Sequence, residues 1–296
     1  MMRLRIPATS ANLGAGFDAL GLALGLYNYI EAELIPSGLE IIYKNGDALP
    51  TDESNLVYRA AKRLFKAAGR EVPPIKLLLE NNIPPARGLG SSSACIAGGL
   101  LLANALLENK FSRRELMYHA AALEGHSDNT TPALCGGFNV SVCEGEEIFY
   151  YNHHIRGDLK FLVMITDFQV KTAAARGALP KAYPIGDVSY SLPRAALFTA
   201  AIISGEYENL PCAVKDRLHQ PYRGRLIDGY RQIREYLTGC GVLGTYISGS
   251  GPTLISLVRA SDADGIFAGA SGFLARAYPS WRALLLGADN EGALLI

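Results

Sequence analysis

Hydrophobic and polar residues alternate along the chain with two different periods, which predict helices and strands that follow one another over most of its length. From Leu56 onward, apolar side chains recur at i, i+1, i+4, i+5, i+8 and i+9. This block lies between acidic residues and Gly69, as on one face of an amphipathic helix. The helices predicted in this way cover 52–69, 95–107, 112–124, 192–204, 224–238 and 263–277. The predicted strands cover 28–34, 39–43, 75–80, 138–143, 159–166, 244–247, 253–258 and 281–286.

The pattern of elements starts again near residues 150–158, which divides the chain into two predicted domains, 1–155 and 156–296. In the second half, strands alternate with helices and end in a β–α–β unit, which favours a ferredoxin-like arrangement. A chain of 296 residues is long enough to bury two compact cores. We therefore expect an α+β fold made of two units.

Composition and charge narrow the class of protein. Hydrophobic residues make up 49% and charged residues 19%, as in ordinary globular chains, and 28 basic residues balance 28 acidic ones. This balance gives no electrostatic footprint for nucleic acid or for an anionic membrane, so we expect neither as a partner. The first residues lack an apolar run of signal-peptide length, and we expect a cytoplasmic protein. The five cysteines show no C-x-x-C spacing, which favours reduced thiols over a disulfide or a zinc site.

The most informative stretch is a glycine- and serine-rich loop between the strand 75–80 and the helix 95–107. Gly88 and Gly90 permit positive φ, and the amide N–H groups at the start of a helix can bind phosphate oxygens. The G-x-x-x-x-G-K-[ST] loop is absent here, as is the third glycine of the dinucleotide fingerprint. For this fragment alone, an ordinary loop with a well-capped helix is the alternative. The candidate phosphate-binding residues are Pro84, Pro85, Ala86, Arg87, Gly88, Leu89, Gly90, Ser91, Ser92, Ser93 and Ala94.

Two other segments rich in small residues carry polar candidates. Near the N-terminus, Asn12 and Asp18 are the amide and carboxylate among three glycines, a composition suited to close approach of a ligand. A turn in which both side chains bond only their own backbone is the alternative. Asn55, at the start of the first predicted helix, is a further candidate for a ligand contact. The second glycine-rich turn, 249–251, is expected to approach a ligand or the first loop closely.

Ionisable and amide groups crowd the segment between the helix 112–124 and the strand 138–143. Glu124 lies at the C-terminus of that helix, where the helix dipole disfavours a carboxylate unless a cation is nearby. This position indicates Mg²⁺ or a basic partner. A surface glutamate followed by a hydrogen-bonded turn histidine, His126, is the alternative.

Two arginines lie outside the periodic segments. Arg176 belongs to the basic loop 171–180, and Arg223 also lies in a loop context. A bidentate clamp for a carboxylate or a phosphate is one interpretation, and a pair of solvated surface residues is the other.

Four motifs occur together and in order along the chain. They are Pro7-x-Thr-Ser-Ala-Asn-Leu-Gly-x-Gly-Phe-Asp18, Pro84-x-x-x-Gly-Leu-Gly-Ser-Ser-Ser-Ala94, Glu124-Gly-His-x-Asp-Asn129 and Ser248-Gly-Ser-Gly-Pro-Thr253. With them the chain resembles the GHMP small-molecule kinases over nearly its whole length, and within that superfamily the homoserine kinase family. The resemblance implies the GHMP kinase fold. Its first domain is similar to ribosomal protein S5 domain 2, with a left-handed β-α-β crossover, and its second domain is ferredoxin-like.

The resemblance also implies a reaction. Its family transfers the γ-phosphoryl group of ATP to the hydroxyl of L-homoserine, a step of threonine biosynthesis. The phosphates would bind 88–93, and Ser92 and Glu124 would hold Mg²⁺. Homodimers are common among the relatives, so a homodimer is an expectation here.

The resemblance assigns roles to further residues around the substrates. In the amino-acid site it implies Asp18 for the ammonium, Arg176 and Arg223 for the carboxylate, Asn12 and His126 for the polar ends, and Thr172 on the covering loop. Relatives such as mevalonate kinase place an aspartate beside the hydroxyl as a base, and the matching residue here is Asn129. The proton is therefore expected to pass to a phosphate oxygen or to water. The residues nominated for catalysis are Asn12, Ser92, Glu124 and Asn129, and Asn55 joins the phosphate loop as an ATP contact.

Two other functions compete with this one. A GHMP kinase for a mevalonate-pathway or sugar alcohol would have no ammonium to pair with Asp18. A catalytically inactive nucleotide-binding sensor would have an eroded phosphate loop or would lack Glu124, and both are intact in the sequence.

Overall fold

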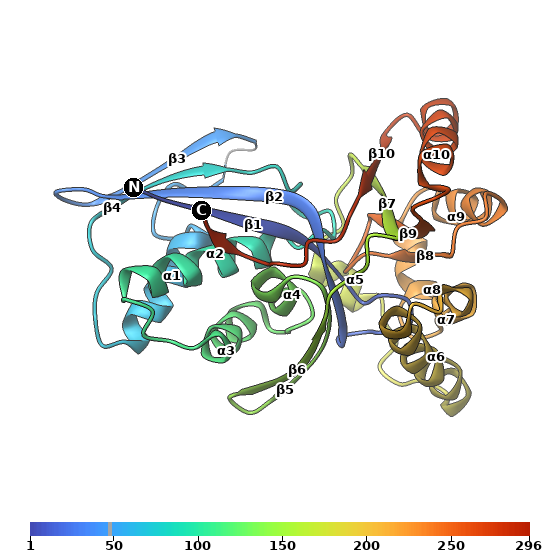
Figure 1. Cartoon of the computed structure of the whole chain (residues 1–296), viewed down its shortest axis with the longest axis horizontal. Helices are drawn as coiled ribbons and strands as arrows, with labels where there is room; N and C mark the ends of the chain where they lie inside the picture. The colour runs from blue at the N-terminus through green and yellow to red at the C-terminus, as the bar shows by residue number, and fades with distance from the viewer. Residues whose placement is uncertain (47–48) are drawn as a thin grey trace.

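The computed structural model of the chain describes residues 1–46 and 49–296. Within these residues, strands form a seven-stranded and a four-stranded sheet, which lie at opposite ends of an elongated molecule (Figure 1). The strands of the first sheet are β1 Met2–Ala11, β2 Leu20–Leu34, β3 Leu39–Asn45, β4 Ile75–Glu80, β5 Phe138–Glu144, β6 Glu147–His153 and β11 Leu294–Leu295. The strands of the second sheet are β7 Leu159–Thr166, β8 Gly244–Ile247, β9 Leu254–Arg259 and β10 Trp281–Leu286.

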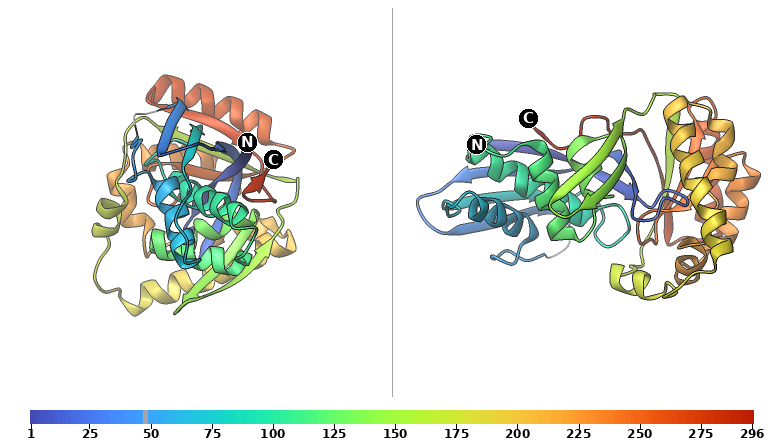
Figure 2. Two further views of the ribbon diagram at one scale, coloured as in Figure 1. Left: turned by 90° about the vertical axis from the view of Figure 1, so that its left-hand side faces the viewer. Right: turned by 90° about the horizontal axis from the view of Figure 1, so that it is seen from below.

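The first sheet has the order β11-β1-β2-β4-β3, and the hairpin β5–β6 joins it through β2. Strands β3 and β4 are parallel and are connected through α1. Four helices cover one face of this sheet and lie in front of its strands when the molecule is seen from below (Figure 2, right). They are α1 Leu56–Ala67, α2 Ser91–Leu106, α3 Arg113–Glu124 and α4 Thr130–Cys135. Helix α2 is largely buried, so its N-terminus is fixed in place by the core around it.

The second sheet is antiparallel with the order β10-β7-β9-β8, as expected for a ferredoxin-like unit. Alternate side chains of β7 enter two different cores. Phe161 and Val163 pack into the large core that continues from the first sheet, whereas Leu162 and Met164 pack with the last helices. The helices of this half are α5 Thr172–Gly177, α6 Ile185–Ser204, α7 Leu210–Ala213, α8 Gln220–Arg223, α9 Tyr230–Gly239 and α10 Ala263–Ala277. Two short 3₁₀ turns, η1 Tyr207–Asn209 and η2 Gly224–Leu226, lie between them.

Most predicted elements are confirmed, and several agree with the structure at both ends: β4, β7, β8, α10 and β10. The single helix predicted over 224–238 is wrong. Gly229 has a φ of 76° there, so the chain leaves the helical region and α9 begins only at Tyr230. The loop predicted over 171–180 contains α5, and the helix predicted over 192–204 begins seven residues earlier, at Ile185.

The strands 28–34 and 39–43 exist, but they are not hydrogen-bonded to each other. Strand β4 lies between them, and β2 extends back to Leu20. Near the end of the described chain, β11 pairs with β1, and the Gly137 N–H donates to the Asp289 carbonyl at 2.6 Å. The predicted second domain, 156–296, therefore includes a segment that belongs to the first sheet. No helix among the described residues has the length and apolar character needed to cross a membrane.

Candidate active site

The loop between β4 and α2 is held in a conformation that requires its two glycines. Gly88 and Gly90 have φ values of 77° and 66°, and Gly90 is the N-cap of α2. A Cβ on Gly88 would lie 2.3 Å from the carbonyl oxygen of Ser248, and a Cβ on Gly90 would lie 1.8 Å from Oγ1 of Thr9. The loop therefore fits closely between β1 and the 248–251 turn, as predicted for the second glycine-rich turn.

Hydrogen bonds from both sheets fix this loop. The Thr9 N–H donates to the Leu89 carbonyl at 3.1 Å, and Oγ of Ser248 donates to the Gly88 carbonyl at 2.6 Å. The Arg87 guanidinium donates to the carbonyls of Thr166 at 2.9 Å and Pro85 at 3.0 Å, and also to the Asp167 carbonyl. Arg87 thus ties the loop to the end of β7. The first amide groups of α2, which have no partner within the helix, are held in a fixed direction.

The loop and the start of α2 form one wall of a cavity of about 100 Å³. Most residues nominated from the sequence line this cavity together. They are Asn12, Asp18, Ala86, Arg87, Gly88, Leu89, Gly90, Ser91, Ser92, Glu124, His126, Asn129, Thr172, Arg176 and Arg223. Asp128, Gly249 and Ser250 complete the lining. Segments that are far apart in the sequence therefore meet at one site, where the two halves of the molecule face each other.

Ser92 and Glu124 are neighbours on the side of the cavity where α2 begins. Oγ of Ser92 donates to Oε2 of Glu124 at 2.8 Å, and Oγ of Ser93 donates to Oε1 at 3.2 Å. Among the described residues, no group of three or more histidine, cysteine or acidic side chains is arranged to hold a metal ion. A hydroxyl and one carboxylate suit Mg²⁺, which commonly completes its shell with water and substrate phosphates.

The opposite side of the cavity carries charges of both signs. Asp18 and Arg176 form two hydrogen bonds, at 3.0 and 3.1 Å. Arg223 is buried, and one of its terminal nitrogens donates to the Gly249 carbonyl at 2.7 Å. Burial lowers the pKa of Arg223, and Arg176 adds to this effect by repulsion. An acid and two guanidinium groups therefore lie beside the phosphate loop.

Asn12 shapes this charged side. Asn12 and Asp18 both have positive φ, at 61° and 53°, which asparagine and aspartate tolerate better than most residues. Oδ1 of Asn12 accepts from the Asp18 N–H at 2.8 Å, and Nδ2 donates to the Gly249 carbonyl at 3.1 Å. The turn interpretation of Asn12 is thus partly correct, because its side chain also joins the two halves of the molecule.

Asp128, a buried acid of the motif 124–129, was not among the residues nominated from the sequence. Oδ1 of Asp128 lies 2.6 Å from Nδ1 of His126, and this contact raises the pKa of His126. Asn129 accepts from Oγ1 of Thr9 at 2.8 Å and donates weakly to Asp128 at 3.5 Å. The position of Asp128 between two nominated residues was the signal that could have identified it.

Five nominated residues lie outside the cavity. Ser93 and Ala94 are buried in the first turn of α2, and Pro84 and Pro85 line a second hollow of about 210 Å³. The two hollows share Ser91. Arg282 of β10, which was not nominated from the sequence, lines the second hollow.

Asn55 is the fifth. Its side chain caps α1 through the Val57 N–H at 2.9 Å and donates to the hydroxyl of Tyr43 at 2.7 Å and to the Pro50 carbonyl at 2.8 Å. The structure therefore gives Asn55 a capping role and does not bring it to the cavity.

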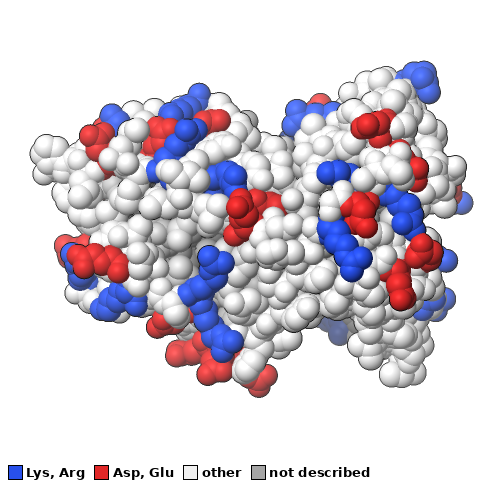
Figure 3. All heavy atoms as spheres, in the orientation of Figure 1, with Lys and Arg blue, Asp and Glu red and all other residues white. Residues whose placement is uncertain are grey.

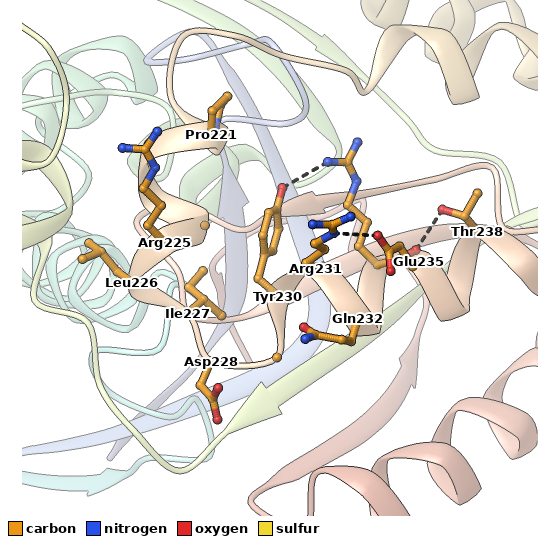
Figure 4. Close-up of a pocket in the computed structure, with 13 residues that line it drawn as sticks. Pro221, Arg225, Leu226, Ile227, Asp228, Tyr230, Arg231, Gln232, Glu235 and Thr238 are labelled. Atoms are coloured by element: carbon orange, nitrogen blue, oxygen red, sulfur yellow. Dashed lines mark hydrogen bonds and ion pairs between the residues drawn. The ribbon is translucent and has the colours of Figure 1, made fainter.

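A larger open hollow of about 990 Å³ lies against α9 and η2 and contains none of the nominated residues (Figure 4). Two of its arginines have partners within the hollow: Nε of Arg231 donates to Glu235 at 2.8 Å, and Arg234 donates to the hydroxyl of Tyr230 at 3.4 Å. On the face drawn in Figure 3, basic and acidic side chains are interspersed, in agreement with the balanced composition.

Comparison with known proteins identifies the family. Residues 55–137 match the GHMP kinases N terminal domain, and residues 200–275 match the GHMP kinases C terminal domain. The homoserine kinase of Caldicellulosiruptor bescii is 44% identical over 296 residues, covering 99% of this chain and 96% of that protein. The chain belongs to the GHMP kinase family. The homoserine kinase of Petrotoga mobilis is 45% identical over 260 residues, covering 87% of this chain and 85% of that protein.

Solved structures of GHMP kinases agree with this assignment. The homoserine kinase of Cytophaga hutchinsonii has a TM-score of 0.90 at 26% identity, covering 100% of this chain and 97% of that one. A mevalonate kinase has a TM-score of 0.72 at 14% identity, covering 98% and 100%, and shows the fold alone. The resemblance inferred from the four motifs is confirmed. As a member of the GHMP kinase family, the protein uses ATP.

Proposed function

We propose that this GHMP kinase transfers the γ-phosphoryl group of ATP to the hydroxyl of L-homoserine, giving O-phospho-L-homoserine and ADP for threonine biosynthesis. The observation that carries the proposal is the charge arrangement of the cavity. Beside the phosphate loop, one acid and two arginines offer partners for both charges of a zwitterionic amino acid. Asn12 bonds both the Asp18 N–H and the Gly249 carbonyl, and the same carbonyl accepts from Arg223, so Asp18 and Arg223 are tied to one turn.

The two hollows that share Ser91 support a mode of ATP binding. The triphosphate would cross the loop, with its terminal phosphates at the N-terminus of α2, where amide groups and the helix dipole favour anions. The nucleoside would occupy the hollow beside Pro84 and Pro85. Ser92 and Glu124 would hold Mg²⁺, which neutralises charge on the phosphates when it is bound.

The acceptor would replace the ion pair that Asp18 and Arg176 now form with each other. Its ammonium would bind Asp18, and its carboxylate would bind Arg176 and Arg223. Asn12 and His126 would contact its polar ends, and Thr172, at the start of α5, would cover it. This exchange conserves charge pairing, so the partly buried acid and arginine are not left without partners.

Catalysis would come mainly from positioning and from electrostatic stabilisation of the transferred group. Asn129 has no basic atom to accept the hydroxyl proton, and its amide is bonded to Thr9. The proton therefore passes to a phosphate oxygen or to water. A wild-type kcat that rises log-linearly with pH and becomes flat in Asn129→Asp would contradict this part of the proposal.

The test is an ADP-release assay with Mg-ATP and L-homoserine, L-threonine, L-serine or mevalonate. We expect turnover to favour L-homoserine strongly and to be lost in Arg223→Ala. Arg225→Ala is the matched control, because Arg225 lies two residues away, outside the cavity, and is exposed. Preference for mevalonate would instead support a kinase for another alcohol, and absence of turnover with retained ATP binding would support a sensor.

A further inference from the structure

Phe17 lies between Gly16 and Asp18 at the charged side of the cavity, half-buried and outside every role described above. Its ring stacks on the imidazole of His219, with 5.5 Å between the ring centroids and 28° between the planes. The guanidinium carbons of Arg223 and Arg176 lie 5.0 and 5.6 Å from the centroid of the Phe17 ring. One aromatic ring therefore contacts both arginines of the clamp.

We infer that Phe17 is a positioning residue that holds Arg176 and Arg223 at the spacing a substrate carboxylate needs. Through this spacing, Phe17 contributes to the selection of alcohols that carry a carboxylate. The inference rests on the proposed function and adds a residue to it.

Arg176 and Arg223 repel each other, and in the structure Asp18 offsets this repulsion. When a ligand takes Asp18 away, the two arginines need another support. Arg223 is only 2% exposed, its Nε has no hydrogen-bond partner among the described residues, and a single terminal nitrogen donates to Gly249. Solvent therefore screens its charge poorly. The negative face of an aromatic ring attracts cations, most strongly where water is excluded. The ring of Phe17 offsets part of the repulsion and restricts where each guanidinium lies.

His219 gives Phe17 a neutral and rigid backing. His219 is completely buried, and burial lowers its pKa to about 4, so the imidazole adds no third positive charge at neutral pH. Its Nε2–H donates to the Gly14 carbonyl at 2.7 Å, and its backbone N–H donates to Oδ2 of Asp216 at 2.8 Å. One bond thus fixes the imidazole at Nε2 and the other fixes the backbone of His219, and the buried imidazole restrains the Phe17 ring in turn.

The contact matters most while the substrate enters, before its carboxylate has bound Arg176 and Arg223. Asp18 and Arg176 are bonded to each other in the structure, and an incoming ammonium takes Asp18 away from Arg176. Arg176 is on a short helix and is nearly half exposed, so few other contacts restrain it. The neighbouring ring of Phe17 then keeps Arg176 beside Arg223.

The experiment compares L-homoserine with 3-aminopropan-1-ol, which has the same hydroxyl and ammonium but no carboxylate. Phe17→Leu should lower the ratio of the two kcat/KM values about tenfold. Phe17→Tyr keeps the ring and should stay within about twofold of the wild type. Phe267→Leu, which shortens a partly buried phenylalanine of the second core, should leave the ratio unchanged. An equal loss with both substrates would show a merely structural role and overturn the inference.

Calorimetry gives the second readout, which also decides the case when 3-aminopropan-1-ol turns over too slowly to measure. In Phe17→Leu, L-homoserine should bind about tenfold more weakly while the dissociation constant of Mg-ATP stays the same. Unchanged L-homoserine binding would overturn the inference. If the wild type does not phosphorylate L-homoserine, the proposed function fails. If the wild type phosphorylates L-homoserine and Phe17→Leu behaves in the same way, only the inference about Phe17 fails.

Discussion

The proposed function gives the two sides of the cavity different means of recognising their ligands. The phosphate side consists mainly of one continuous stretch, 86–92, which ends in the first residues of α2. The acceptor side consists of side chains from four distant segments, represented by Asp18, His126, Arg176 and Arg223. A backbone site is fixed once the loop folds, whereas a side-chain site depends on how several elements pack. Substitutions should therefore damage the first side through conformation and the second through charge.

The largest effect is expected for Gly88→Ala. The new Cβ would lie 2.3 Å from a backbone oxygen of Ser248, at a φ of 77°, so the loop or the 248–251 turn must move. We expect a loss of about 2–4 kcal/mol in unfolding free energy and a large rise in the KM for ATP. Denaturant unfolding measures the loss of unfolding free energy, and steady-state kinetics measures the KM for ATP.

Gly265→Ala is the control for this substitution. Gly265 lies within α10, and a Cβ there would meet nothing within 4 Å, so alanine should stabilise the helix by about 0.5–1 kcal/mol. If Gly88→Ala unfolds like the wild type and binds ATP normally, the loop is not conformationally fixed and the comparison fails.

On the acceptor side, Arg223→Ala should lower kcat/KM for L-homoserine about 100-fold or more while the KM for ATP changes little. Arg223→Lys should recover only part of this loss, because an ammonium cannot form the planar bidentate pair. Steady-state kinetics with each substrate varied in turn gives the result. Equal losses of kcat/KM for L-homoserine and for ATP would mean that the two sides of the cavity are not independent.

Glu124→Gln tests the proposed Mg²⁺ site, which lies between the phosphate side and the acceptor side of the cavity. We expect the Mg²⁺ concentration for half-maximal activity to rise about tenfold, because a neutral amide is a weaker ligand than a carboxylate. Glu108→Gln, in an exposed position after α2, should leave the Mg²⁺ dependence unchanged. An unaltered magnesium titration in Glu124→Gln would remove Glu124 from the metal site.

The smallest effect concerns the stability contributed by His126. Its hydrogen bond with Asp128 raises its pKa, so the contribution is complete below the unfolded-state value of about 6.5. It is lost as the pH rises through the higher folded-state pKa. The difference in Tm between wild type and His126→Gln should thus be larger at pH 5.5 than at pH 8. A difference that grows with pH would contradict the sign of the shift.

The same contrast explains what the sequence could predict. Strand β4, the glycine loop and α2 follow one another, and their signals of apolar alternation, positive-φ glycines and an apolar helix are local. Phe17 and Arg282 gave no comparable signal, since each gains its place from residues more than 90 positions away. Asp128 gave only a weak one, its position between two nominated residues, and its role depends on the hydrogen bond with His126. The break before α9 was missed because a left-handed glycine and a helical glycine look alike in an apolar pattern.

The pairing of β11 with β1 sets the order in which the molecule can be completed. Strand β1 is synthesised before its partner, Leu294–Leu295, which is made roughly 15–60 s later at ordinary rates of synthesis. During this interval one edge of β1 has its amide and carbonyl groups unpaired, which is where sheets recruit foreign strands. The strand that carries Thr9 is thus bonded to the glycine loop through Leu89 well before its other end, at Leu4 and Arg5, gains its partner strand.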